Sequence, residues 1–293
     1  MRILLTGGTG FLGSRILKRI LELGHDVILL KRSTSNTYGI KDLLQYVAMY
    51  DVDLCGLDMP FRNEPQIDIV VHTATNYGRR NETLTDIVVS NVVQPLNLLE
   101  LAMFNDVPRF INTDTILSPE INAYSLSKHQ FKAWANRVLN LSECRLTLTN
   151  VMIHQMYGPF DDGNKFPSWV IRQCLSNVQA IRLTFGEQVR DFIYVDDVVN
   201  AFLTVIDAPQ SGSTSVENVE IGTGTGVTLK EFVEVVKDLT NSTSQLEFGA
   251  IPYRKNEVMK AVADISALVE RGWKPTVTLR DGLMIVIEEE LKL

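Results

Sequence analysis

The chain has 293 residues, 45% of them hydrophobic and 22% charged, and its formal net charge is -7 at pH 7. This composition excludes disordered and fibrous chains and allows one large domain or two smaller ones. An acidic chain without a long run of Lys or Arg lacks the basic face that nucleic acids and anionic membranes require. Neither is therefore an expected partner.

The N-terminus enters a strand and a glycine turn at once, so we expect no signal peptide. We also expect no membrane span, since no segment reaches the roughly 20 apolar residues that one needs. An odd number of cysteines at unrelated spacings (Cys55, Cys144 and Cys174) predicts buried thiols and a cytoplasmic protein. The four histidines show no metal-ligand spacing, and no metal is expected.

Short aliphatic runs alternate with helical segments through the first half of the chain. Strands are predicted at Arg2–Leu5, Asp26–Leu30, Val52–Cys55, Ile67–His72, Arg109–Asn112 and Leu146–Ile153, and helices at Leu12–Leu23, Leu84–Met103 and Tyr124–Leu141. This alternation, with strands apolar on both faces, is typical of a parallel sheet covered by helices on each side. The expected fold is therefore a Rossmann-like, doubly wound α/β sheet.

After about Ile153 the pattern becomes less regular, with a loop rich in Gly, Pro and Asp and a helix around Trp169–Cys174. We expect residues 1–150 to form a dinucleotide-binding domain, to which the chain returns around 188–208. Residues 151–293 are expected to form a smaller α/β substrate lobe. Because open α/β sheets bind ligands beyond the carboxyl ends of their strands, this lobe should close over that edge.

A glycine turn follows the first strand and precedes an amphipathic helix. Gly7, Gly10 and Gly13 have the spacing of a dinucleotide site: one glycine for the tight turn, one for close approach of a pyrophosphate and one for packing of helix on strand. The free N–H groups of the helix start, around Phe11 and Leu12, would face the phosphates. The turn therefore predicts a bound dinucleotide.

The second strand should end at the adenosine ribose, where an NAD site carries Asp or Glu for the 2′-hydroxyl. This chain carries Lys31, Arg32 and Ser33 there, two cations and a hydroxyl that suit a 2′-phosphate. We therefore expect NADPH, with NADH as the alternative. Asp58, read as lying just after the third strand, is a candidate partner of the adenine amino group.

Tyr124 and Lys128 are four residues apart at the start of a predicted helix, so their side chains lie on one face. An ammonium beside a phenol favours the phenolate and would lower the pKa of the tyrosine, which then exchanges protons with a carbonyl or alcohol. The preceding strand delivers Thr113 to the same edge of the sheet. These three residues are the candidate catalytic set.

Several motifs together resemble those of the extended short-chain dehydrogenase/reductase family, which contains nucleotide-sugar epimerases, dehydratases and reductases. They are the glycine turn, His72-Thr73-Ala74, Asn91, Thr113, Tyr124 with Lys128, Tyr157-Gly158-Pro159, Gly186–Asp197 and Gly272–Pro275. The similarity extends over essentially the whole chain and is greatest to nucleotide-sugar 4-ketoreductases. A homodimer formed through the two long helices is a further expectation from the resemblance.

The resemblance implies a role for each matching residue. Thr113 would orient the C4 oxygen of the sugar, Tyr124 would be the acid/base, and Lys128 would hold the nicotinamide ribose. Further cofactor contacts would come from Thr73, Ala74 and Asn91, and substrate contacts from Thr75, Asp114, Gln155, Phe166, Arg190 and Arg254, the two arginines binding the diphosphate. For Gln155, Phe166 and the two arginines, an ordinary packing role is the alternative.

The residue after Asp114 separates the possible reactions. A 4,6-dehydratase of this family carries Asp-Glu after the threonine, whereas this chain carries Asp114-Thr115 and lacks that second carboxylate. A 4-epimerase retains NAD and usually keeps the ribose-binding acid. We therefore expect an NADPH-dependent 4-ketoreductase of a nucleotide-linked 6-deoxy or 3,6-dideoxy hexose. One alternative is an NAD-dependent 4-epimerase. Another is a non-enzymatic NADP-binding sensor, but a sensor has no use for the intact catalytic set. The sequence does not decide which nucleotide the sugar carries.

Overall fold

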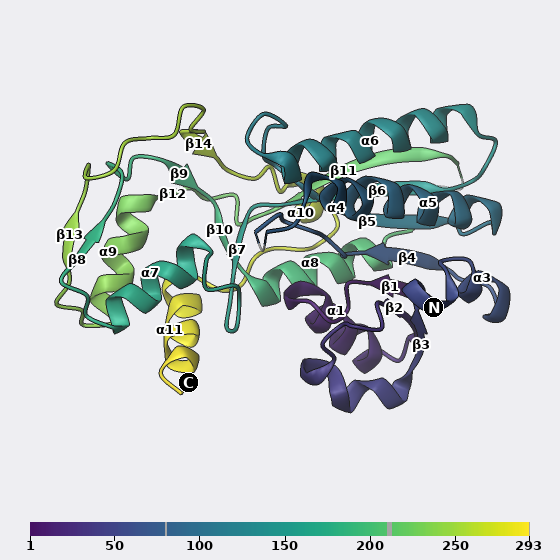
Figure 1. Ribbon diagram of the computed structural model, residues 1–293, viewed down its shortest axis with the longest axis horizontal. Helices are drawn as coiled ribbons and strands as arrows, with labels where there is room; N and C mark the ends of the chain where they lie inside the picture. The colour runs from purple at the N-terminus through teal and green to yellow at the C-terminus, as the bar shows by residue number, and fades with distance from the viewer. Residues whose placement is uncertain (80, 210–212, 293) are drawn as a thin grey trace. The chain divides into compact units, whose positions relative to one another are not determined.

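The computed structural model describes residues 1–79, 81–209 and 213–292, and the chain forms two compact units (Figure 1). Unit one comprises Met1–Met152 and Phe202–Val219, and unit two comprises Ile153–Ala201 and Glu220–Leu293. The first boundary lies close to the one expected at residue 150. The return to unit one, at Phe202–Val219, overlaps the expected 188–208 only from residue 202 on, because the segment up to Ala201 packs within unit two.

A seven-stranded sheet in the order β11-β6-β5-β4-β1-β2-β3 forms the centre of unit one. Its strands are β1 (Arg2–Thr6), β2 (Asp26–Lys31), β3 (Val47–Asp51), β4 (Ile69–His72), β5 (Arg109–Thr115), β6 (Thr147–Ile153) and β11 (Ser215–Ile221). The pairs β1–β2, β1–β4, β2–β3 and β4–β5 are parallel. The predicted doubly wound α/β fold is confirmed.

The third strand differs from the prediction. Val52–Cys55 is a short helix, α2, and the strand is the preceding segment Val47–Asp51. This strand lies at the edge of the sheet and is only partly buried. The short alternating stretch that follows it was the stronger strand signal, and the prediction was wrong.

Helices cover both faces of this sheet. They are α1 (Phe11–Glu22), the 3₁₀ helix η1 (Tyr38–Tyr46), α2, α3 (Met59–Asn63), α4 (Leu84–Val88), the π-helical turn η2 (Val89–Val93), α5 (Gln94–Phe104), α6 (Ala123–Leu141) and the end of α8 (Val195–Asp207). On one face, Leu99 of α5 and Phe131 of α6 share a buried cluster with Phe110 of β5. On the other face lie α1 and the end of α8 (Figure 1), where Arg109 donates to the carbonyls of Val205 and Ile206.

The helical segment Leu84–Phe104, made of α4, η2 and α5, is long and apolar enough to cross a membrane by length and composition alone. The sequence prediction had found no such segment. Its apolar residues Leu98, Leu99 and Ala102 are buried in the cluster on the sheet, which is the position of a core helix in a soluble protein. This helix is therefore weak evidence for a membrane span.

The described residues of unit two form short strands and four helices besides the start of α8. Its elements are β7 (Gln155–Tyr157), α7 (Phe166–Leu175), β8 (Ala180–Arg182), β9 (Val189–Arg190), β10 (Phe192–Tyr194), β12 (Val227–Thr228), α9 (Leu229–Leu239), β13 (Gln245–Glu247), β14 (Lys260–Ala261), α10 (Ser266–Glu270) and α11 (Leu279–Glu290). The Phe192 and Phe232 rings stack at 4.2 Å in its core. The buried Asp191 accepts the N–H groups of Gly224 and Ala263, so one carboxylate joins three segments.

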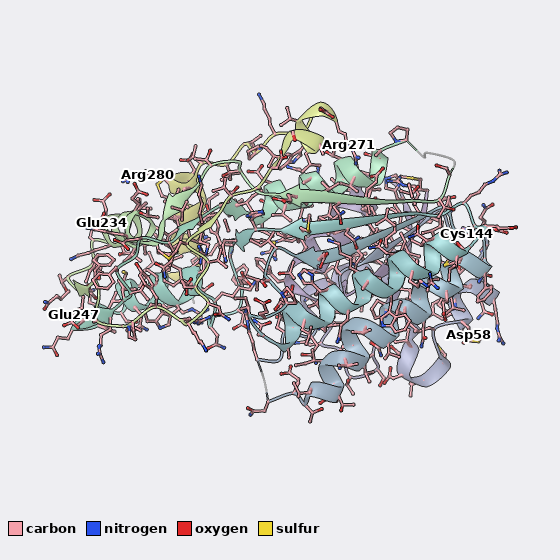
Figure 2. All side chains as sticks on the ribbon, turned by 90° about the horizontal axis from the view of Figure 1, so that it is seen from above. Asp58, Cys144, Glu234, Glu247, Arg271 and Arg280 are labelled. Carbon is pink, nitrogen blue, oxygen red and sulfur yellow. The ribbon has the colours of Figure 1, made fainter. Side chains whose placement is uncertain are left out.

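The three cysteines are free, but they differ in burial. Cys174 is buried in α7, and burial raises the pKa of its thiol. Cys55 and Cys144 are only partly buried, and Cys144 follows the end of α6 (Figure 2). The expectation of three buried thiols therefore holds for Cys174 alone.

Candidate active site

The glycine turn packs against the end of β4. Gly7 has a φ of +71°, which favours glycine, and a Cβ placed there would lie 2.5 Å from the backbone nitrogen of Ala74. A Cβ at Gly13 would lie 2.2 Å from the carbonyl oxygen of Gly7. The hydroxyl of Thr73 donates to the Thr6 carbonyl at 2.8 Å and fixes the neighbouring loop. The backbone here is too close-packed for any side chain at these two glycines.

This cradle fits the pyrophosphate of a dinucleotide. Gly10 is the N-cap of α1, and Phe11 and Leu12 begin that helix, where backbone N–H groups point out of the helix end. Their direction and the positive end of the helix dipole favour a phosphate group. Beside the cradle, on the same edge of the sheet, lie Thr73 and Ala74. Glycine turn, helix start and strand end therefore have the arrangement that the sequence predicted.

The end of β2 is less basic than its sequence indicates. Lys31 forms an ion pair with Asp51 at the end of β3, and both the N–H and the hydroxyl of Ser33 donate to Asp53, at 2.7 and 2.6 Å. Arg32 is exposed. Two carboxylates that the sequence analysis missed thus already bind two of the three predicted phosphate ligands, which leaves Arg32 as the main candidate.

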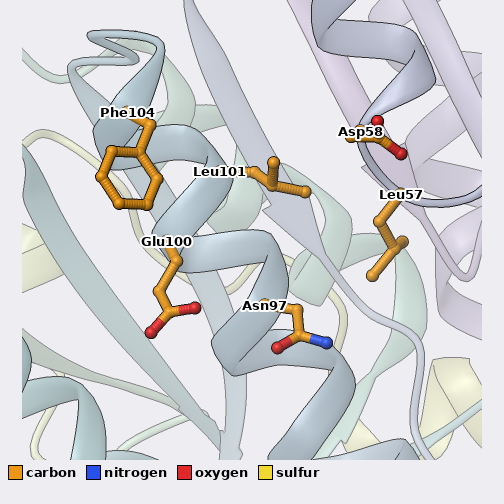
Figure 3. A pocket seen from close by; sticks show the side chains of 6 residues that line it. All are labelled: Leu57, Asp58, Asn97, Glu100, Leu101 and Phe104. Carbon is orange, nitrogen blue, oxygen red and sulfur yellow. The ribbon is translucent and has the colours of Figure 1, made fainter.

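Asp58 does not lie at the end of the third strand. That strand ends at Asp51, and Asp58 is instead the N-cap of α3, with an ion pair to Arg62 at 2.7 Å. Leu57 and Asp58 border a shallow pocket whose other side is the outer face of α5, with Asn97, Glu100, Leu101 and Phe104 (Figure 3). The strand assignment on which this prediction depended was wrong, and Asp51 has the strand-end position; the contact of Asp58 with adenine stays a prediction.

Thr113 and Lys128 meet at the end of β5. The buried Lys128 ammonium donates to the backbone carbonyl of Thr113, with an Nζ–O distance of 2.7 Å. The Oγ1 atom of Thr113 is buried and has no hydrogen-bond partner among the described residues, and the same holds for Thr75. A buried hydroxyl without a partner is costly unless a ligand supplies one. Both hydroxyls therefore suit contact with a bound polar molecule.

The phenol of Tyr124 differs from the prediction. Burial, followed by the neighbouring phenol of Tyr77, raises its pKa above the ordinary value, while a hydrogen bond with the Thr115 side chain and the Arg79 guanidinium act in the opposite direction. Burial also lowers the pKa of Lys128 to about 8. The expected lowering of the pKa of Tyr124 by Lys128 is therefore wrong, because desolvation of the phenolate dominates. Tyr124 is a protonated acid at neutral pH.

Asn91 connects the loop after β4 to the helix that carries Tyr124. Its side chain accepts the N–H of Asn76 and donates to the Asn76 carbonyl, both at 2.8 Å, and donates to Oγ of Ser127 at 3.0 Å. Ser127 in turn donates to the carbonyl of Tyr124 at 2.7 Å. Asn91 lies in the π-helical turn η2, a feature that is frequent at functional sites. Both N–H donors of its amide are engaged and its oxygen accepts one bond, so Asn91 fixes these neighbours; its contact with the cofactor stays a prediction.

Asp114 is buried behind the catalytic residues. Its carboxylate accepts the backbone N–H of Thr115 at 2.8 Å and lies 3.7 Å from the Lys132 ammonium. Thr115 is the last residue of β5, two positions after Thr113. Because side chains alternate along a strand, these two threonines share one face of the sheet, and Asp114 lies on the other. Asp114 is therefore placed to hold the strand end and to set the local charge.

The substrate residues predicted in unit two have mixed surroundings. Arg190 forms a part-buried ion pair with Glu257 at 2.7 Å, whereas Arg254 is exposed. Gln155 lies in β7, and its N–H donates to the Asp191 carbonyl. The ring of Phe166 contacts those of Trp169 and Phe232, so its observed contacts are those of a packing residue.

Comparison with known proteins agrees with this arrangement. A model of the NAD dependent epimerase/dehydratase family matches residues 3–222. The chain belongs to this family. It is therefore an NAD(P)-dependent enzyme of the oxidoreductase type, and the resemblance inferred from the motifs is confirmed.

Individual relatives cover nearly the whole chain. It is 32% identical to a CDP-abequose synthase of Salmonella typhimurium over 99% of this chain and 97% of that protein, and 27% identical to a putative UDP-glucose 4-epimerase of Methanocaldococcus jannaschii, over 97% of each. The structure of a UDP-glucose 4-epimerase with UDP-glucose from Thermotoga maritima matches with a TM-score of 0.83 at 25% identity. That match covers 100% of this chain and 99% of the other.

Replacing Gly13 tests the cradle. A Gly13→Ala side chain would collide with the Gly7 carbonyl, so we expect affinity for NADPH to fall by roughly tenfold or more, about 1.4 kcal/mol per tenfold, in a fluorescence titration. Gly39→Ala is the matched control, since a Cβ at Gly39 meets nothing within 4 Å. Equal affinities for all three proteins would contradict the assignment of the cradle.

Proposed function

We propose that this protein is a CDP-abequose synthase-like 4-ketoreductase. It would reduce the 4-keto group of a nucleotide-linked 6-deoxy or 3,6-dideoxy hexose with NADPH and so make an activated deoxysugar for a surface polysaccharide such as an O-antigen. The observation that carries the proposal is the set of Tyr124, Lys128 and the partnerless Thr113 hydroxyl at one strand end, beside the glycine cradle. The similarity to CDP-abequose synthases supports the choice of substrate.

In this proposal each catalytic residue has one role. The glycine cradle would hold the dinucleotide, which would supply the hydride for the carbonyl carbon of the sugar. Thr113 donates its hydroxyl proton in a hydrogen bond to the carbonyl oxygen, and Tyr124 transfers its proton to that oxygen as negative charge develops there. Lys128, held by the Thr113 carbonyl, would contact the nicotinamide ribose and stabilise the phenolate that remains.

The protonation state of Tyr124 supports reduction. A phenol whose pKa is raised by burial stays protonated at neutral pH, and it can still protonate an alkoxide, which is a far stronger base. Thr115 occupies the position where a dehydratase of this family carries a carboxylate, and a threonine cannot remove a carbon-bound proton in its place. These residues therefore favour reduction over dehydration.

Unit two is the proposed substrate unit, and unit one the proposed dinucleotide-binding unit. Arg190 and Arg254 are the candidate partners of the diphosphate, because guanidinium groups bind phosphate oxygens in charge-assisted pairs. Glu257 neutralises part of the charge of Arg190, so the exposed Arg254 would carry more of this interaction. Gln155 remains a candidate contact of the sugar side.

The second candidate is an NAD-dependent nucleotide-sugar 4-epimerase. Asp51 and Asp53 near the end of β2 favour it, because carboxylates there suit a ribose hydroxyl better than a phosphate. Similar proteins with epimerase names also support it. An epimerase would be purified with NAD bound and would consume no NADPH.

We also propose a homodimer located in the cytoplasm. Apolar side chains remain exposed on the outer faces of the two long helices of unit one, among them Val88, Val93, Leu126 and Trp134. Leu99 and Phe131, on the inner faces, are buried against the sheet. An exposed apolar face of this kind is typical of a subunit interface.

Removing the phenolic hydroxyl tests the mechanism. We expect Tyr124→Phe to lower kcat by roughly 10²–10⁴-fold and Thr113→Val by roughly 10²–10³-fold, while NADPH affinity changes little. Stopped-flow NADPH oxidation and a binding titration measure the two quantities. Near-normal turnover of Tyr124→Phe would overturn the assignment.

Arg32 tests the cofactor preference. A charge-assisted bond to a 2′-phosphate contributes about 1.5–3 kcal/mol, so Arg32→Gln should weaken NADPH binding roughly 10–100-fold and leave NADH binding unchanged. Arg62→Gln removes another exposed arginine, one paired with Asp58, and serves as control. A wild-type protein that binds NADH more tightly than NADPH would contradict the preference.

Trp134 tests the dimer. Its side chain is 57% exposed on α6, and a charge at the centre of an apolar interface leaves it desolvated and unpaired. Light scattering should give a dimer for the wild type and a monomer for Trp134→Asp, with Tyr38→Asp as the control for an exposed aromatic residue elsewhere. A monomeric wild-type protein would rule the dimer out.

A further inference from the structure

The ring of Tyr77 packs on the ring of Tyr124. Their centroids are 4.9 Å apart and their planes are inclined by 43°. Tyr77 belongs to the loop after β4, and the preceding Asn76 is held by Asn91, which is bonded through Ser127 to the Tyr124 carbonyl. The loop and the first turn of α6 are therefore fixed to each other, and the two rings meet in a defined geometry.

A turn after Tyr77 places the Arg79 guanidinium over the Tyr77 ring. Gly78 has a φ of +65° and donates its N–H to the Asn76 side chain at 2.9 Å, and a Cβ there would lie 2.7 Å from Ile87. The chain thus turns back, and the Arg79 guanidinium carbon lies 5.1 Å from the centroid of the Tyr77 ring. A guanidinium over a tyrosine ring is attracted by the ring quadrupole. Arg79 thus contacts the Tyr77 ring, which contacts the Tyr124 ring, and this set of three residues is named here the Arg79 stack.

A different residue acts on the reactive end of Tyr124. The Thr115 side chain acts to lower the pKa of the phenol, and the Oγ1 of Thr115 accepts the N–H of Leu117 at 3.2 Å. Tyr77 thus contacts the ring, and Thr115 lies near the phenol. The hydroxyl of Thr113, on the same face of β5 as Thr115, has no hydrogen-bond partner in the part of the chain that the structure describes. The Tyr124 proton and the Thr113 hydroxyl can therefore both interact with one substrate oxygen.

We propose that Tyr77 is a positioning residue for Tyr124 and that Arg79 holds Tyr77 in place. The inference rests on the proposed function, in which Tyr124 gives its proton to the sugar oxygen. A small displacement of a proton donor lowers the rate by about a hundredfold per ångström, so a fixed ring matters to this step. Tyr77 acts to raise the pKa of Tyr124 and Arg79 acts to lower it, which agrees with both side chains lying close to the phenol.

Variants of the Arg79 stack test this role. Tyr77→Ala should lower kcat about ten- to a hundredfold, with KM for the sugar and NADPH affinity nearly unchanged. The solvent deuterium isotope effect on kcat should rise, because proton transfer becomes slower relative to hydride transfer. Tyr77→Phe keeps the ring and should restore kcat to within about threefold, and Arg79→Gln should lie between the two.

A second stack provides the matched control. The Lys41 ammonium lies 5.3 Å from the ring centroid of the exposed Tyr38, so Tyr38→Ala removes an equivalent cation–ring pair and should change nothing. A loss confined to KM, or an unchanged isotope effect in Tyr77→Ala, would overturn the proposal. Retained turnover in Tyr124→Phe would instead overturn the proposed function.

A crystal structure of Tyr77→Ala gives a readout that does not depend on the reaction. We expect the Tyr124 ring to occupy more than one rotamer or to move from its position beside Thr115. An unchanged, well-ordered Tyr124 would overturn the positioning role, whichever reaction the enzyme catalyses.

Discussion

The hydrogen bond from the buried Lys128 ammonium to the Thr113 carbonyl ties the helix that carries the acid to the strand that carries the substrate-facing hydroxyl. A buried ammonium must have partners, because its charge loses the stabilisation of water. This bond supplies one, and it aligns the first turn of α6 with the end of β5. Tyr124, Thr115 and the free Thr113 hydroxyl owe their relative positions to that alignment.

Around this bond the site is closed by contacts from three separate segments. The glycine cradle fixes the end of β4 through Thr73, and Asn91 ties the following loop to α6. That loop then presents Tyr77 to the face of Tyr124. The chemistry therefore depends on backbone packing at glycines as much as on the three residues that face the substrate.

Much of the fold and the site could be predicted from the sequence, because the informative residues are local in the chain. A strand, a glycine turn and a helix follow one another within fifteen residues of the N-terminus, and Tyr124 and Lys128 are one helical turn apart. The predictions were wrong where tertiary contacts determine the structure. The sequence prediction placed the third strand at Val52–Cys55 instead of Val47–Asp51, and with it Asp58 at a strand end. The ion pair of Lys31 with Asp51 joins two strands, and the Tyr77 contact joins a loop to a helix; neither has a signal in the sequence.

The central claim is a net reduction at C4 of a nucleotide-linked deoxyhexose. The most direct measurement follows NADPH absorbance with purified enzyme and a panel of CDP-, dTDP-, GDP- and UDP-linked 4-keto-6-deoxy and 4-keto-3,6-dideoxy sugars, with NADH in parallel. We expect one NADPH consumed for each sugar reduced, with one nucleotide preferred. Protein isolated with bound NAD that interconverts C4 epimers, and oxidises NADPH with no sugar of the panel, would contradict the account.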